Sequence, residues 1–228
     1  MYIRAAHAEA DIRILRRLIH DNPWDESSET ELGHLRGHLA RQNPQSKAII
    51  DALTSNPALN TLEQEVLVIF SVPTHHYITP KFYVDTKPTT GKVVPTWNYA
   101  AAQVYGKAKV FFDSASEETS TFLQKQIQDL THHSETTIMG YTGADRPTEW
   151  TVSDAPERYV DILKKNIVGI EITIERLEGK FKMSQEMKKE DREGVIKGLG
   201  DFDSDAAQEV SKIVQHRSDL LSQTPSHK

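Results

Sequence analysis

This 228-residue chain contains no cysteine, so its fold cannot depend on disulfide bonds and no thiolate can bind a metal. The absence of cysteine suits a reducing compartment. No stretch of about 18 consecutive apolar residues is present, and we therefore expect no membrane-spanning segment. The N-terminal MYIRAAHAEADIRILRRLIH carries charges every few residues and lacks the apolar core of a signal peptide. These absences predict a soluble, cytoplasmic protein.

Basic residues are also in the minority, with 27 Lys and Arg against 33 Asp and Glu and a net charge of −6. Nucleic-acid affinity depends largely on Lys and Arg that neutralise phosphates, so direct nucleic-acid binding is disfavoured. The sequence lacks the glycine-rich dinucleotide and P-loop motifs, the His-Glu-x-x-His zinc motif and the Gly-x-Ser-x-Gly hydrolase motif. The common nucleotide-binding and hydrolase folds lose support.

The length and the 37% hydrophobic content suffice for one domain with a single core. The only break in composition lies near Gly198–Ser204, close to the end of the chain. We therefore expect one domain over residues 1–200 and an appended C-terminal helix over 201–228.

Hydrophobic periodicity predicts both helices and strands. Apolar residues three and four apart predict helices over Glu9–His20, from a Ser114–Glu117 capping box to Thr131, over Pro156–Lys165, over Glu186–Lys197 and from Asp203 or Ser204 onward. Apolar or alternating runs predict strands over Gln64–Val72, Tyr77–Thr79, Tyr99–Phe112 and Val168–Glu175. Polar segments at Asp25–Glu31 and Lys87–Lys92 are expected to be loops. This element order indicates an α+β fold.

Three local expectations accompany these elements. Gly106, inside a predicted strand, suggests a β-bulge. Tyr159, Ile162 and Leu163 should face inward from their helix. Ser184 should cap the helix that begins near Glu186, and Gly198 and Gly200 should end it.

The last predicted helix carries an apolar stripe between Ala206 and Leu221. An amphipathic helix needs a partner for its apolar face. Packing on its own barrel and packing on a second subunit are both consistent with the sequence.

The segment 36–44 combines two guanidinium groups, an imidazole and a carboxamide around Gly37. Arg36, Arg41, His38 and Asn43 form a set that suits an anion, because arginine makes bidentate contacts with phosphate. The alternative is the start of a helix whose arginines pair with surface carboxylates.

The segment 95–99 places a hydroxyl, an indole and a carboxamide in succession, at Thr96, Trp97 and Asn98. An aromatic ring can pack on a planar ligand while polar groups bind its edge. The alternative is a core strand in which Trp97 only fills volume. In a strand, Trp97 and Asn98 would point to opposite faces.

The segment 179–185 joins a predicted strand to a predicted helix, and its Lys182, Ser184 and Gln185 form a second candidate anion site. The alternative is an ordinary strand-to-helix turn. His75 and His76 follow an apolar strand and could act as an acid or base, although a surface turn explains them equally simply.

No metal site is expected. His34 and His38 stand four apart, a spacing that binds a metal only on a helix, but Gly33 and Gly37 disfavour a helix there.

The segments LRGHLARQNP at 35–44, VPTWNYAA at 94–101 and GKFKMSQ at 179–185 resemble the PaiB family of proteins that bind flavin mononucleotide (FMN). The resemblance implies an antiparallel FMN-binding split β-barrel with peripheral helices, usually a homodimer with FMN at the subunit interface. Some members are described as negative transcriptional regulators. The chain is therefore expected to be a regulatory or sensor flavoprotein, with an FMN-dependent oxidoreductase and a flavin-free dimeric interaction module as alternatives.

The resemblance also implies roles for residues at the matching positions. Phosphate contacts fall to Arg36, Arg41 and Lys182, ring contacts to Thr96, Trp97 and Asn98, and further contacts to His38, Asn43, Ser184 and Gln185. The catalytic residues, if any, are not implied.

Two departures from the family pattern are visible. After Asn22-Pro23 the family continues into two strands, whereas this chain runs directly into the acidic Asp25–Glu31, so about 25–30 residues, one hairpin, are missing. Glu186 stands where the family usually has Asn, next to an expected phosphate site. Both departures bear on whether FMN is retained.

Overall fold

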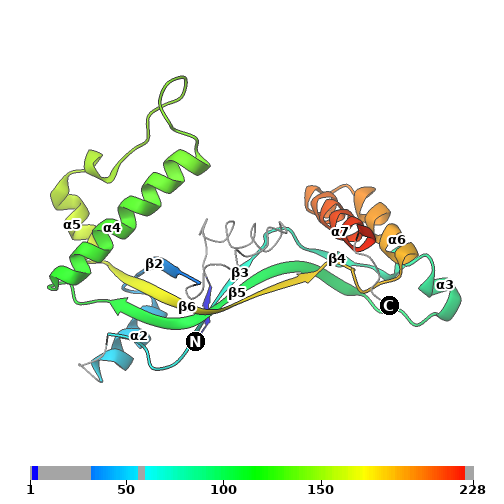
Figure 1. Ribbon diagram of the computed structural model, residues 1–228, viewed down its shortest axis with the longest axis horizontal. Helices are drawn as coiled ribbons and strands as arrows, with labels where there is room; N and C mark the ends of the chain where they lie inside the picture. Colours follow the sequence, from blue (N-terminus) through cyan, green and yellow to red (C-terminus); the bar gives the residue numbers. More distant parts are fainter. Residues whose placement is uncertain (1, 5–31, 56–59, 224–228) are drawn as a thin grey trace. The chain divides into compact units, whose positions relative to one another are not determined.

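A computed structural model describes residues 2–4, 32–55 and 60–223 (Figure 1). The predicted helix Glu9–His20, the predicted loop Asp25–Glu31 and the position of the missing hairpin lie outside the described residues. Among the residues that are described, no helix is both long enough and apolar enough to span a membrane.

Helices and strands alternate irregularly along the chain. Its elements are β1 (Tyr2–Arg4), β2 (His34–Ala40), α2 (Pro44–Thr54), β3 (Val66–Ser71), β4 (His76–Ile78), a 3₁₀ turn (Pro80–Phe82), α3 (Thr86–Thr90), β5 (Thr96–Phe111), α4 (Glu117–His133), a π-helical turn (Ser134–Ile138), a second 3₁₀ turn (Val152–Asp154), α5 (Glu157–Lys164), β6 (Ile167–Lys182), α6 (Lys189–Gly200) and α7 (Asp205–Gln223). The sheet has the order β1-β3-β5-β6-β2, and β4 pairs with β5. β2 with β6 and β4 with β5 are antiparallel. The predicted α+β split-barrel fold is confirmed.

The chain divides into two compact units. Unit 1 contains the described residues within 1–13, 21–68 and 104–177, and unit 2 contains those within 69–103 and 178–228. Helices α2, α4 and α5 therefore belong to unit 1, and α3, α6 and α7 to unit 2. The division at residue 200 expected from the sequence stays a prediction, and α7 belongs to unit 2 together with α6.

The alternating strand predicted around Val168 is present as the first part of β6. Val168, Ile170 and Ile172 are buried, as the period of two requires. β6 pairs with β2 in a register that sets Gly37 opposite Ile170 and Arg36 opposite Glu171. The strand also continues to Lys182, further than its apolar alternation indicated.

The bulge predicted at Gly106 is wrong. Residues at even positions from Asn98 to Val110 are buried without a change of phase, whereas a bulge would shift the alternation. A Cβ atom at Gly106 would lie 1.9 Å from the carbonyl oxygen of Thr173 on β6. Glycine is needed here because the neighbouring backbone approaches too closely for a side chain.

The helices of unit 1 differ in detail from the predictions. α4 begins after Ser116, so the predicted capping box at Ser114 is wrong. α5 is present, but its Tyr159, Ile162 and Leu163 are 57%, 51% and 46% exposed, so the inward orientation is wrong. Periodicity identifies the apolar face of a helix but does not show which neighbour that face contacts. On α5, the contact with α4 is made by Lys164, whose Nζ donates to the side-chain oxygen of Gln124 at 3.1 Å.

The core of unit 2 joins β4, β5 and β6 to α6 and α7, which lie side by side (Figure 1). Ala207, Val210 and Val214 on α7 have no exposed surface. The C-terminal helix therefore packs within its own chain. Its buried stripe includes Ala207 where the sequence suggested Ala206.

The strand-to-helix connection also differs from the prediction. α6 starts only after Lys188, so Ser184 is not its cap. Gly198 lies inside α6, where a Cβ atom would meet the Phe82 ring at 2.2 Å. This glycine therefore permits close packing and does not end the helix.

Candidate functional site

The four candidate anion-binding residues of unit 1 lie on β2 and at the start of α2. Arg36 donates from Nε to the Glu171 carboxylate at 2.6 Å, across the register of β2 and β6. Its side chain is 46% exposed. This is the pairing with a surface carboxylate that the alternative interpretation expected, on a strand rather than a helix.

Arg41 bonds to the backbone of two other elements. Nη2 donates to the carbonyl oxygen of Phe112 at 2.6 Å, and Nε donates to that of Lys165 at 3.0 Å. The guanidinium group thus joins the end of β2 to the segments that follow β5 and α5. Donors already used in this way are not available to a phosphate.

His38 and Asn43 also have protein partners. His38 Nδ1 lies 2.6 Å from the side-chain oxygen of Gln126 on α4. The Asn43 side chain accepts a hydrogen bond from the backbone N–H of Gln45 at 2.9 Å, and Pro44 occupies the first turn of α2. Asn43 is therefore a helix N-cap. The structure shows all four residues of unit 1 in local structural roles.

The six other predicted residues lie together in unit 2, on β5 and at the end of β6. We call them the β5–β6 cluster: Thr96, Trp97, Asn98, Lys182, Ser184 and Gln185. Lys182 joins the two strands, because its Nζ donates to the Thr96 hydroxyl and to the carbonyl oxygen of Trp97 at 3.2 Å.

The charge of Lys182 has no counter-ion in the described part of the chain. Its partners are two neutral oxygens, and no carboxylate lies within ion-pair distance. By contrast, Lys188 forms an ion pair with Asp85 at 2.7 Å, and the resulting hydrogen bond raises the pKa of Lys188. A partly buried ammonium group without a carboxylate partner favours an anionic ligand.

Asn98 and Ser184 form the buried side of the cluster. Both side chains are fully buried, and Asn98 Nδ2 donates to Ser184 Oγ at 3.0 Å. Ser184 has a φ of +59°, a conformation that is unfavourable for a residue with a Cβ atom. The hydrogen bond from Asn98 therefore stabilises a strained turn directly after Lys182.

Gln185 completes this turn. Its side chain accepts a hydrogen bond from the Met183 N–H at 2.6 Å and donates to the carbonyl oxygen of Phe181. Asn98, Ser184 and Gln185 thus fix the backbone that carries Lys182. Their side chains are used internally.

Trp97 lies on the face of β5 opposite to that of Asn98, as the alternation of side chains along a strand predicts. It is 47% exposed, and its register partner on β4, Tyr77, is 44% exposed. The two rings are 6.3 Å apart, and the His75 ring lies 5.6 Å from Trp97. We call these three residues the aromatic ledge. The sequence predicted a strand beginning at Tyr77 and gave His75 as a turn residue or an acid–base group. The pairing of β4 with β5 places both residues beside Trp97.

Tyr83 belongs to the buried hydrophobic core of unit 2, which also contains Ala100 of β5 and Met183. Its hydroxyl is the buried side-chain polar atom that lacks a hydrogen-bond partner among the described residues. Burial raises the pKa of Tyr83, and the negative charges of Glu186 and Asp191 raise it further. Glu186 is thus a source of negative potential in unit 2, at a position where the family usually has Asn.

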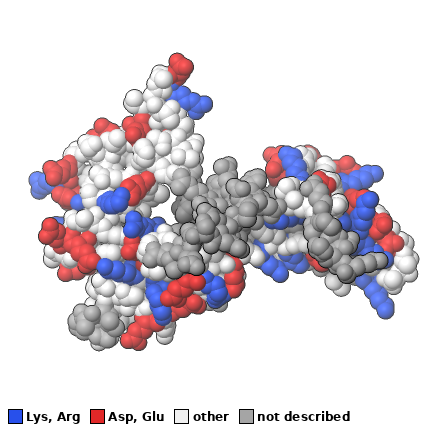
Figure 2. Space-filling view, viewed as in Figure 1, with Lys and Arg blue, Asp and Glu red and all other residues white. Residues whose placement is uncertain are grey.

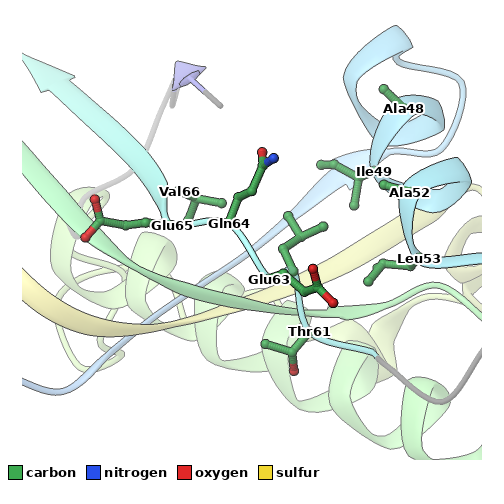
Figure 3. Close-up of a pocket in the computed structure, with 10 residues that line it drawn as sticks. Ala48, Ile49, Ala52, Leu53, Thr61, Glu63, Gln64, Glu65 and Val66 are labelled. Carbon is green, nitrogen blue, oxygen red and sulfur yellow. The ribbon is translucent and has the colours of Figure 1, made fainter. Parts of the chain in front are cut away.

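A cavity of about 410 Å³ lies elsewhere, in unit 1, between α2 and residues 61–66 (Figure 3). Ile49 and Leu53 form its apolar wall, and Glu63 and Glu65 are among its polar residues. It contains none of the ten predicted residues and no basic side chain. Its charged lining residues are the carboxylates Glu63 and Glu65, of which Glu65 is paired with Arg176 at 3.8 Å, so the lining itself offers no cation to the phosphate of FMN.

The two groups of residues therefore differ in their fit to FMN. The β5–β6 cluster offers an ammonium group without a counter-ion among the described residues, and the aromatic ledge, which shares Trp97 with the cluster, offers exposed rings. These two kinds of group suit a phosphorylated planar ligand. The unit 1 residues each have a protein partner for at least one polar atom. The structure brings six of the ten predicted residues together and places the other four in the other unit.

Comparison with known proteins agrees with the resemblance. A family model described as "Putative FMN-binding domain" matches residues 24–176, more than half of the chain. The matched region includes Trp97 but ends before Lys182.

Three relatives cover most of the chain. An uncharacterized protein of Emericella nidulans is 53% identical over 253 residues, covering 96% of this chain and 98% of the relative. An uncharacterized protein of Aspergillus fumigatus is 48% identical over 257 residues, with the same coverages. The protease synthase and sporulation protein PAI 2 of Bacillus subtilis is 26% identical over 185 residues, covering 81% of this chain and 73% of that protein.

The aligned lengths also bear on the missing hairpin. The alignment spans 253 positions but contains only 96% of this chain, about 219 residues, so the E. nidulans relative fills about 34 positions for which this chain has no residue. This number is large enough to include the hairpin of about 25–30 residues that the family pattern implies. With its fold, its motif residues and these matches taken together, the chain belongs to the PaiB-type FMN-binding family.

Proposed function

We propose that this protein binds FMN at the β5–β6 cluster and acts as a regulatory or sensor flavoprotein. The observation that carries the proposal is Lys182, whose ammonium group has only neutral oxygen partners in the described part of the chain, one of them the backbone carbonyl of Trp97, a residue with an exposed ring. The family match supports the choice of FMN over other phosphorylated planar ligands.

Each part of the cluster has a distinct task in this proposal. Lys182 binds the phosphate, and Trp97 with Tyr77 contacts the ring. Asn98 and Ser184 hold the turn that orients Lys182. FMN, when bound, supplies reversible redox chemistry, and the protein supplies position and charge.

Replacing Lys182 tests the site directly. We expect Lys182→Gln to weaken FMN binding by about tenfold or more, because the phosphate loses a charge-assisted contact of roughly 1.5–3 kcal/mol. Titration of the purified apoprotein with FMN, followed by flavin fluorescence, gives the dissociation constants. Lys180→Gln is the matched control, an exposed lysine two residues earlier on the same strand. Equal affinities for the two variants would contradict the proposed site.

We prefer the regulatory role to that of an FMN-dependent oxidoreductase because of the residues in the cluster and the name of one relative. The cluster contains no histidine–carboxylate pair or other acid–base pair, and the name of PAI 2 connects that relative to protease synthesis and sporulation. The FMN-bound protein should therefore bleach no more than stoichiometrically with a reduced nicotinamide. Repeated turnovers would favour the oxidoreductase, and a preparation that stays colourless with added FMN would favour the flavin-free interaction module.

We also propose a homodimer in the cytoplasm, on the basis of the family resemblance. Light scattering after gel filtration should give twice the 25.8 kDa of one chain. A mass of one chain at micromolar concentration would contradict the dimer.

A further inference from the structure

The exposed indole of the aromatic ledge is held by one side-chain hydrogen bond. Trp97 Nε1 lies 3.1 Å from His75 Nδ1. An indole N–H can only donate, so Nδ1 of His75 must accept with its lone pair. The bond therefore requires an imidazole that carries no proton on Nδ1.

We infer that His75 is a positioning residue for Trp97, and that protonation of His75 releases the indole. A charged imidazolium carries protons on both ring nitrogens and has no lone pair to offer. An N–H on Nδ1 would point at the indole N–H while the two nitrogens are 3.1 Å apart, a separation that is favourable only when one of them accepts a hydrogen bond. Protonation thus replaces an attraction by a repulsion between two donors.

The other groups around Trp97 do not reproduce this contact. Tyr77 meets the indole edge to face at 63°, and Lys182 contacts only the carbonyl oxygen of Trp97. The adjacent His76 is directed elsewhere, with Nδ1 2.7 Å from the carbonyl oxygen of Tyr77 and its ring 5.7 Å from Phe202. Of these two histidines, only His75 has a hydrogen bond to the Trp97 indole.

The consequence is a ligand affinity that depends on pH. The ledge should be ordered where the imidazole of His75 is neutral and released where it is protonated. We therefore compare the protein at about pH 8 and about pH 5.5. The ligand part of this inference rests on the proposed FMN site. The positioning of Trp97 by His75 does not depend on any ligand.

The ligand-free protein gives the primary test. The indole N–H resonance of Trp97, assigned by its loss in Trp97→Phe, is followed by NMR between about pH 5.5 and 8. We expect a sigmoidal shift in the wild-type protein and in His76→Asn. His75→Asn should retain the bond through its side-chain oxygen, which replaces Nδ1, and should abolish the sigmoidal shift. His75→Leu should show the released position at every pH.

The same variants are then titrated with FMN. We expect the wild-type dissociation constant to rise at least threefold from about pH 8 to 5.5 and that of His75→Asn to change less. A Trp97 resonance that titrates identically in His75→Asn and wild type would overturn the inference. A resonance that behaves as expected in a protein without FMN affinity would support the inference and contradict the proposed function.

Discussion

Arg41 and Lys182 are both cations in segments that resemble the family motifs, but their partners give them different roles. Arg41 uses its N–H groups on two backbone carbonyls of unit 1. Lys182 also has only neutral oxygen partners, but both belong to one neighbouring strand, β5, where the ring of Trp97 is exposed. A basic residue in a motif can thus join several segments of the fold or lie beside a surface that is open to a ligand, and its position decides which.

Arg41→Ala should therefore destabilise the protein. Removing the charged donor leaves the partly buried carbonyl of Phe112 without its partner and the exposed carbonyl of Lys165 to water, at a cost of about 1–3 kcal/mol. Urea denaturation measures the free energy of unfolding. Arg36→Ala is the control: its ion pair with Glu171 is half exposed and should contribute about 0–1 kcal/mol.

The FMN affinity of the folded Arg41→Ala protein tests whether Arg41 also contacts the phosphate. We expect FMN affinity close to wild type, because Arg41 is not part of the proposed site. A stable variant that has lost FMN affinity would instead support the phosphate contact that the sequence motif implied.

The sequence identifies the residue types at the site but not their partners. Thr96, Trp97 and Lys182 were predicted from neighbouring residues, and the structure joins them across 86 positions of sequence. The engagement of Arg41 was not predictable, because Phe112 and Lys165 contribute backbone carbonyls, which carry no residue-specific signal. His75 was ambiguous for a similar reason: its role depends on the pairing of β4 with β5.

At the scale of elements, α3 shows how one helix can be stabilised by another. This five-residue helix has no side-chain cap from its own N-cap residue, Asp85. The carboxylate of Asp191, in the first turn of α6, instead accepts hydrogen bonds from the N–H of Asp85 at 2.9 Å and of Thr86 at 3.2 Å, and from the Thr86 hydroxyl. The sequence therefore predicted a loop here, since the capping residue is more than a hundred positions away.

Asp191 should make stability depend on pH. Burial raises the pKa of its carboxyl group, but the hydrogen bonds from Thr86 and Asp85 and the nearby Lys188 charge lower it more, so the net shift is downward. A carboxyl group with a lowered pKa contributes its full stabilisation above the unfolded value of about 3.9 and loses it as the pH falls through the folded value.

The expected result is measurable with Asp191→Asn. At pH 7 we expect a loss of about 1–3 kcal/mol in the free energy of unfolding, because the charged acceptor is replaced by a neutral one. The difference from wild type should shrink as the pH falls below about 4. Glu193→Gln, an exposed carboxylate on the same helix, is the control and should show little effect at either pH. A constant difference across this pH range would contradict the role of the Asp191 charge.

For the whole molecule, periodicity was sufficient for the fold class but not for its division into units. The strands around Val68 and Val168 were predicted because one buried face imposes a period of two. No composition break marks residues 103–104 or 177–178, where β5 and β6 pass between units. A long strand has one continuous sequence pattern, so the sequence carries no signal for the two compact units between which β5 and β6 are divided.

The additional residues of the E. nidulans relative allow a final test at this scale. Every residue of the β5–β6 cluster and the aromatic ledge lies between 75 and 185, far along the chain from Asn22-Pro23, where the hairpin is expected to be missing. If the cluster is sufficient, this chain and the relative should both bind FMN, with dissociation constants within about tenfold of each other. The visible spectra of the two proteins, purified and reconstituted in parallel, provide the measurement. A yellow relative beside a colourless form of this chain would show that the missing residues are needed, because the cluster alone would then be too weak to retain the flavin.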